Sequence, residues 1–253
     1  MDIKKTILQH KQVCSLVSEK RIKQSLDIIA DMLTGVSSGY LRDEYDNVVM
    51  TYRHMLTYTI EGINDPERNK VYIKLIQSIL ELSDQVRQDI LSHYSGWHTY
   101  WVMQQTMKEQ KLSGKTLVET VDDLMFKSEL DEWLKLSNEI NPDPESELAI
   151  KHRELIRKIF NHLWLTDYYG EAEESLINII MNSGKFRWHE TSIFISAITL
   201  SSLRTFQTNK LMNLIRFYET ETVQVTERAL AGLILNLHYY NSRILLYPEI
   251  TDK

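Results

Sequence analysis

The 253-residue chain contains one cysteine, four prolines and eight glycines. The single Cys14 cannot form a disulfide within the chain, and no Asn-x-Ser/Thr acceptor occurs, so nothing points to an oxidising compartment. Proline and glycine fall well below their average usage of roughly 5% and 7%, which leaves few breaks for the turns between short strands. The composition therefore disfavours an all-β fold and favours long helices.

Long apolar runs are also missing. The longest, Ala229 to Leu235, is far shorter than the ~20 residues that a helix needs to span a bilayer. Met1 to Lys5 lead into a polar stretch without the apolar centre of a secretory signal, so we expect a cytoplasmic protein. The net charge of −6 disfavours general nucleic-acid binding, which depends on Lys and Arg neutralising phosphates.

Apolar residues recur at helical spacing along most of the chain. The clearest helix follows Asp65-Pro66-Glu67, a typical helix start, and carries one apolar stripe formed by Val71, Leu75, Ile79, Leu82, Val86 and Ile90. Further helices are predicted at about 3–18, 20–34, 45–59, 97–111, 115–139, 145–166, 171–183, 190–206, 208–220 and 223–240.

The last third of the chain repeats itself at an offset of 32 residues. Ile193, Ala197, Leu203 and Leu214 recur as Val225, Ala229, Leu235 and Leu246. A fixed period built from two helices is typical of stacked helical repeats, because one hairpin cannot bury its apolar face alone. The predicted fold class is therefore all-α, a right-handed α-α superhelix formed as a solenoid of antiparallel helix hairpins.

One internal linker stands out, Asn141-Pro142-Asp143-Pro144, because its alternating prolines cannot continue a helix. We expect an N-terminal helical segment over residues 1–140 and a helical repeat segment over 145–253, or one continuous solenoid.

The second repeat is cut short by Pro248, which leaves Ile244, Leu245, Leu246 and Tyr247 without a following hairpin to pack against. Either this segment caps the stack or the chain is the N-terminal part of a longer protein. Terminal repeats normally have a polar outer face, so we favour the longer protein.

The segment from Glu190 to Tyr247 resembles HEAT or armadillo repeats. It has small residues inside its first helices (Ser196-Ala197 and Ala229 to Gly232), a short turn and an antiparallel partner helix, but it lacks the first-helix proline and the Asp/Arg ladder of HEAT repeats. The stretch Tyr52 to Tyr58, with Gly62 and Asp65 to Arg68, also resembles an uncharacterised bacterial family of long all-helical proteins. A HEAT-like scaffold implies binding of a protein partner on its concave face.

Templates for catalysis and ligand binding each fail at a particular residue. Ser113-Gly114-Lys115-Thr116 ends like a phosphate-binding loop, but Glu109 occupies the position of the first glycine. We expect Ser113 or Thr116 to cap a helix instead. His189-Glu190 opens like a zinc-protease motif, but Ile193 replaces the second histidine, and no histidine has the preceding glutamate of a di-iron site. We expect no catalytic residue, no metal and no cofactor.

Two reactive side chains fit structural roles. His152 lies in line with Leu148, Leu155 and Ile159, which predicts a hydrogen-bonded core histidine in place of a ligand or general base. Cys14 lies beside Val13, which predicts a small core residue in place of a nucleophile.

The densest aromatic stretch runs from His93 to Trp101. Tyr94, Trp97, Tyr100 and Trp101 form a candidate partner-binding patch, because Trp and Tyr dominate interface hot spots. Trp97 and Trp101 lie one helical turn apart and share a face, so the same residues could instead fill the angle between two packed helices.

The leading interpretation is a non-catalytic helical-repeat scaffold that mediates protein-protein interaction with a protein or peptide partner. Two alternatives remain. One is an all-helical enzyme whose pocket is built from distant helices. The other is a HEAT-like nucleic-acid-binding module, which would need a continuous Lys/Arg stripe.

Overall fold

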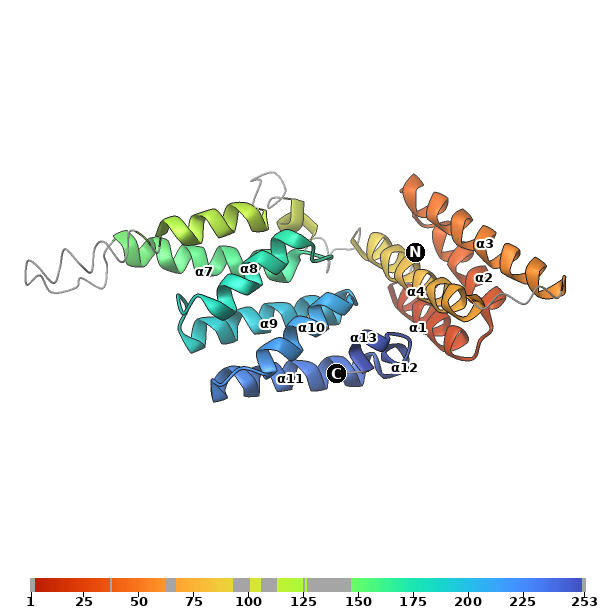
Figure 1. Cartoon of the computed structure of the whole chain (residues 1–253). Coiled ribbons are helices and arrows are strands. Elements are labelled where there is room, and N and C mark those ends of the chain that lie inside the picture. Colours follow the sequence, from red (N-terminus) through yellow and green to blue (C-terminus); the bar gives the residue numbers. More distant parts are fainter. Residues whose placement is uncertain are drawn as a thin grey trace, which may run out of the picture. The chain divides into compact units, whose positions relative to one another are not determined.

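The computed structural model describes residues 3–36, 38–61, 67–92, 101–105, 113–124, 126 and 147–251. Within these ranges every regular element is a helix (Figure 1), which confirms the predicted all-α class. None of these helices combines the length and the apolar composition that a bilayer crossing requires.

The chain divides into two compact units. Unit 1 comprises residues 1–101 and 241–253, and unit 2 comprises residues 102–240. The predicted linker at 141–144 lies outside the described residues.

Unit 1 is built around four helices that share one apolar core. They are α1 (Ile3–Ser18), α2 (Ile22–Leu33), α3 (Gly39–Ile60) and α4 (Arg68–Ser92). The core contains Val13, Ile29, Ile79 and Val86, all fully buried. Helix α4 packs against each of the other three, so the longest helix of the unit lies at its centre.

Helix α4 largely confirms the predicted apolar stripe. Five of its six members are buried, and Val71, near the helix start, is 40% exposed. The expected start signal at Asp65 and Pro66 lies outside the described residues. A second set of positions at helical spacing, Gln77, Glu81 and Asp84, forms a polar stripe along another face of α4.

Residues Asn241–Thr251, named here the C-terminal segment, belong to unit 1. They form two short helices, α12 (Asn241–Ile244) and α13 (Pro248–Thr251). The sequence analysis expected Ile244 to Tyr247 to lack a packing partner. Instead, Ile244 and Tyr247 are buried, Leu246 packs against the apolar core of unit 1, and only Leu245 of the four is largely exposed, at 78%.

Unit 2 contains a series of helices whose ends lie within about two residues of the predicted ones. They are α7 (Glu147–Leu165), α8 (Glu171–Asn182), α9 (Trp188–Arg204), α10 (Thr208–Tyr218) and α11 (Val223–Tyr239). Helix α9 packs against α7 on one side and α11 on the other, and α10 packs against both α9 and α11 (Figure 1).

Residues 114–124 are also helical, and Ser113 caps this helix as predicted, because the Thr116 backbone N–H donates to Ser113 Oγ at 3.2 Å. A Cβ atom at Gly114 would lie 2.8 Å from the Ala172 backbone. Glycine therefore lets this helix approach the first turn of α8 closely.

Helices α9 and α11 also approach each other at a glycine. A Cβ atom at Gly232 would lie 2.3 Å from Thr199 Oγ1. The absence of a side chain at this position sets the spacing between the two helices, and the candidate site lies along the same pair.

Candidate functional site

The predicted aromatic patch falls largely outside the residues that the structure describes. Tyr94, Trp97 and Tyr100 lie in the range 93–100, which is not described. Trp101 is helical and 40% exposed. The patch therefore stays a prediction of the sequence.

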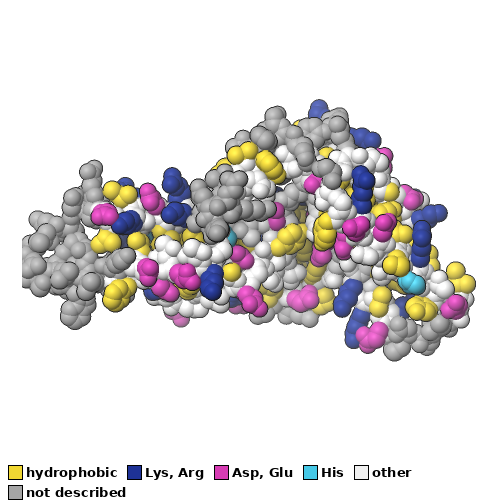
Figure 2. Space-filling view, turned by 90° about the horizontal axis from the view of Figure 1, so that it is seen from above, with side chains coloured by type: hydrophobic (Ala, Val, Ile, Leu, Met, Phe, Trp, Pro, Cys, Tyr) yellow, Lys and Arg dark blue, Asp and Glu magenta, His cyan; other side chains and the backbone are white. Residues whose placement is uncertain are grey.

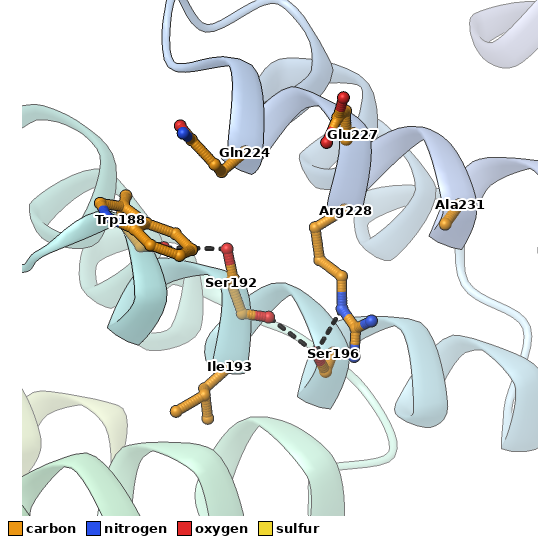
Figure 3. A pocket seen from close by; sticks show the side chains of 8 residues that line it. All are labelled: Trp188, Ser192, Ile193, Ser196, Gln224, Glu227, Arg228 and Ala231. Atoms are coloured by element: carbon orange, nitrogen blue, oxygen red, sulfur yellow. Dashed lines mark hydrogen bonds between the residues drawn. The ribbon is translucent and has the colours of Figure 1, made fainter.

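An open groove of about 450 Å³ runs between α9 and α11 (Figure 3). Helix α9 contributes Trp188, Ser192, Ile193 and Ser196, and helix α11 contributes Gln224, Glu227, Arg228 and Ala231. The groove is accessible, because Trp188 is 52% exposed and Ile193 is 41% exposed.

Arg228 reaches from α11 across the groove to α9 (Figure 3). Its Nε donates to Ser196 Oγ at 2.9 Å, and Ser196 Oγ donates in turn to the Ser192 carbonyl at 2.6 Å. This chain of hydrogen bonds orients the guanidinium through Nε. Its two terminal amino groups make no hydrogen bond to the described part of the chain, so they can serve a ligand.

The groove combines recognition groups without an activated nucleophile. Its two serine hydroxyls both donate to helix carbonyls, Ser192 Oγ to Trp188 and Ser196 Oγ to Ser192. The eight lining residues include no histidine, cysteine or lysine that could act as a general base or thiolate. An exposed indole and an oriented guanidinium suit binding of a peptide that carries an acidic group.

The prediction for His152 is confirmed in part. Its Nε2 lies 2.7 Å from Glu190 Oε1, so the histidine is hydrogen-bonded, but 30% of its side chain is exposed, so it is not a core residue. Glu190 also accepts the Arg187 backbone N–H at 2.8 Å and so caps the start of α9. Glu190, the second residue of the failed zinc motif, therefore has a structural role.

A buried polar cluster in unit 1 centres on Asp84 of α4. Asp84 Oδ1 lies 2.7 Å from His10 Nε2, and Asp84 Oδ2 pairs with Arg243 Nη1 of the C-terminal segment. Arg87 Nη2 lies 3.8 Å from Asp84 Oδ1. His10, Asp84 and Arg243 are each less than a tenth exposed.

The electrostatics of this cluster follow from burial and from the two arginines. Burial lowers the pKa of His10 below 6.5, against the opposing hydrogen bond to Asp84. Burial alone would raise the pKa of Asp84, but the Arg243 guanidinium, followed by His10 and Arg87, holds it well below its usual range. A neutral His10 donates from Nε2 to the ionised Asp84, and its Nδ1 faces Arg87 Nη1 at 3.5 Å.

Cys14 lies beside this cluster but is not arranged for catalysis. Its Sγ is 4.0 Å from His10 Nε2, the same nitrogen that binds Asp84. A Cys-His-Asp triad needs the acid and the thiol on opposite ring nitrogens. Burial, reinforced by Asp84, raises the pKa of Cys14 to about 11, which disfavours the thiolate. Both observations fit the predicted core role.

A second buried titratable side chain, Lys210, links the residues that follow α7 to the end of α9 in unit 2. Its Nζ donates to the Asp167 carbonyl at 2.6 Å and lies 3.4 and 3.5 Å from the carbonyls of Thr205 and Ser201. Lys210 is fully buried, and burial, reinforced by Arg204, lowers its pKa to about 7. Because Nζ is enclosed by carbonyls, a substrate has no access to it.

The described residues hold no group of three His, Cys, Asp or Glu side chains placed to bind a metal ion. On the face shown in Figure 2, the Lys and Arg side chains of the described residues are interspersed with Asp and Glu. A continuous basic stripe, which a nucleic-acid module would need, is not seen on that face of the described chain.

Sequence reasoning missed the principal residues of the groove and of the buried cluster. A signal existed for the groove, since the 32-residue offset aligns Ser192 with Gln224 and Ser196 with Arg228. For Asp84 and Arg243 there was none, because 159 residues separate them.

Comparisons with protein-family models, with curated proteins and with solved structures found no match to this chain. Its function is therefore inferred from its own geometry.

Proposed function

We propose that this chain is a non-catalytic helical-repeat scaffold that binds a protein or peptide partner in the α9–α11 groove. The observation that carries this proposal is the pairing, in one open groove, of the exposed Trp188 with an Arg228 already oriented by Ser196. Trp and Arg are the residues most enriched at interface hot spots.

The packing of α9 against α11 supports the repeat part of the proposal. Ser196 and Arg228 are separated by the repeat offset of 32 residues and are hydrogen-bonded to each other. If α9 and α11 begin two successive repeats, this contact joins equivalent positions of the two, as in stacked HEAT-like or armadillo-like repeats. A right-handed α-α superhelix would extend the same relationship along unit 2.

The lining of the groove suggests the chemistry of the partner. Trp188 and Ile193 offer an apolar surface, whereas Arg228 offers two terminal amino groups that match a carboxylate. A peptide with a large apolar side chain and a nearby Asp or Glu could contact both the apolar surface and the guanidinium. Glu227 would disfavour a second acidic group close to the first.

The experiment is selection of peptides from a displayed random library on the immobilised 253-residue chain. Affinities of the selected peptides are then measured by fluorescence anisotropy. Trp188→Ala and Arg228→Ala should each weaken binding at least about tenfold, as expected for hot-spot residues. Tyr218→Ala is the matched control, because Tyr218 lies on α10 outside the groove and is 44% exposed.

The control should change the affinity by less than about twofold. If the selected peptides bind Trp188→Ala and Arg228→Ala as tightly as the unmodified chain, the groove is not the binding site. If no peptide is enriched, the scaffold proposal itself fails for peptide partners.

A further inference from the structure

Each member of the polar stripe of α4 faces the C-terminal segment. Gln77 Nε2 donates to the Leu246 carbonyl at 2.9 Å, and Asp84 pairs with Arg243. Glu81 lies between them on the stripe; burial raises its pKa, and the charge of the Arg243 guanidinium opposes this effect. All three members of the stripe therefore engage the C-terminal segment.

The C-terminal segment contacts the rest of unit 1 as a bound peptide would. Arg243 is 5% exposed and provides a charged anchor, while Ile244, Tyr247 and Ile250 are buried. Its two helices have only four residues each, which is too short to persist in water without a supporting surface. Its structure therefore depends on unit 1.

The acceptor site keeps its own partners when the segment leaves. Asp84 would retain His10 Nε2 at 2.7 Å and Arg87 Nη2 at 3.8 Å, which come from α1 and α4. A buried ion pair is hard to break chiefly because it leaves one charge without compensation. Asp84 would not be left in that state, and the released Arg243 would be hydrated.

We propose that α1 and α4 of unit 1 form a binding site for an arginine-bearing peptide, and that the C-terminal segment occupies this site as a releasable intramolecular ligand. The recognised pattern is an arginine followed four residues later by an aromatic side chain, as in Arg243 and Tyr247. The site lies in unit 1, so it is independent of the α9–α11 groove in unit 2.

The test uses a fluorescent synthetic peptide with the sequence Tyr239 to Thr251 and full-length chains. Arg243→Ala in the chain weakens its own segment, so the peptide should bind this variant at least about tenfold more tightly than the unmodified chain, where the segment competes. Adding Asp84→Asn to the variant should remove most of this binding. A peptide carrying Arg243→Gln should also bind at least about tenfold more weakly than the native peptide.

A peptide carrying Leu245→Gln is the matched control, because Leu245 is 78% exposed, and it should bind like the native peptide. The proposal is overturned if the native and Arg243→Gln peptides bind alike. It is also overturned if neither binds while the Arg243→Ala chain keeps its helix content.

Hydrogen exchange on the unmodified chain covers the case in which Arg243→Ala does not fold. A releasable segment should exchange its amides at least about a hundredfold faster than the centre of α4, because it opens without global unfolding. Exchange of the segment and of α4 at one common rate would show that the segment never leaves separately, and would overturn the proposal.

Discussion

Arg243 and Asp84 lie 159 residues apart in the sequence, yet their side chains form a buried salt bridge inside unit 1. The pair joins α12 to the centre of α4, where His10 also binds the carboxylate. Side chains from α1 and α12 therefore bind the same carboxylate on α4.

Asp84→Asn should strongly destabilise unit 1. The substitution removes the negative charge that His10, Arg87 and Arg243 share, and breaking a buried pair in this way costs about 3–5 kcal/mol. Hydrogen exchange of α1 and α4 reports unit 1 alone, and their amides should exchange at least about a hundredfold faster. Glu67→Gln, which removes the exposed pair with Lys70, is the control and should leave these rates nearly unchanged. Equal rates in all three chains would contradict a stabilising role for Asp84.

Cys14 should resist alkylation in the native chain. Its pKa of about 11 lies two units above the ordinary 9.0, so the thiolate fraction at pH 8 falls from about one tenth to about one thousandth. Iodoacetamide should therefore modify Cys14 about a hundredfold more slowly than in the urea-denatured chain, as followed by mass spectrometry. A native rate within about threefold of the denatured rate would be inconsistent with a buried, protonated thiol.

Lys210 should make the stability of unit 2 rise between pH 7 and pH 9. Its folded pKa of about 7 is below the ordinary 10.5, so in this range the unfolded chain binds a proton that the folded chain does not. The free energy of unfolding then increases with pH by up to about 1.4 kcal/mol per unit. The stabilisation is complete above about pH 10.5 and is lost as the pH falls toward 7.

Urea denaturation at pH 7, 8 and 9 measures this slope. Lys210→Met should flatten it, although the variant is also less stable because three carbonyls lose their donor. Lys158→Met is the matched control, because Lys158 is an exposed lysine of α7, and it should keep the slope. The same slope in the Lys210→Met chain would assign the pH dependence to another group.

Gly232→Ala should destabilise unit 2, although alanine normally stabilises a helix by up to about 1 kcal/mol relative to glycine. The new Cβ would lie 2.3 Å from Thr199 Oγ1, and relieving such a clash between packed helices costs about 1–3 kcal/mol. Adding Thr199→Ala should restore most of the loss, which a double-mutant cycle of urea midpoints would measure. At Gly39, where a Cβ meets nothing within 4 Å, the same substitution should cause no loss. Additive effects at positions 199 and 232 would argue against this contact.

Much of the fold could be predicted from local patterns. Helix α1 begins and ends where the sequence placed it, and the apolar stripe of α4 is buried from Leu75 to Ile90, because helical spacing alone decides which residues share a face. Ser113 was one of the two caps predicted, with Thr116, since the need of the first helical amides for an acceptor is also local.

Local patterns could not predict which helix faces pack against one another. Periodicity shows that His10 and Asp84 lie on helices, but not that these two positions, 74 residues apart, come into contact. It likewise left the C-terminal segment without a partner, because the residues that receive it lie on α4, far back in the sequence. The groove was missed for a similar reason: Trp188 and Arg228 are ordinary surface residues until α9 and α11 are placed side by side.

The distribution of unit 1 over residues 1–101 and 241–253 also sets an order of events during synthesis. At about 5–20 residues per second, the ribosome delivers Arg243 roughly 8 to 30 s after Asp84. Unit 2, whose residues 102–240 are continuous, can complete its own core within that interval. The nascent chain therefore carries the Asp84 acceptor without its Arg243 partner until residue 243 has been synthesised.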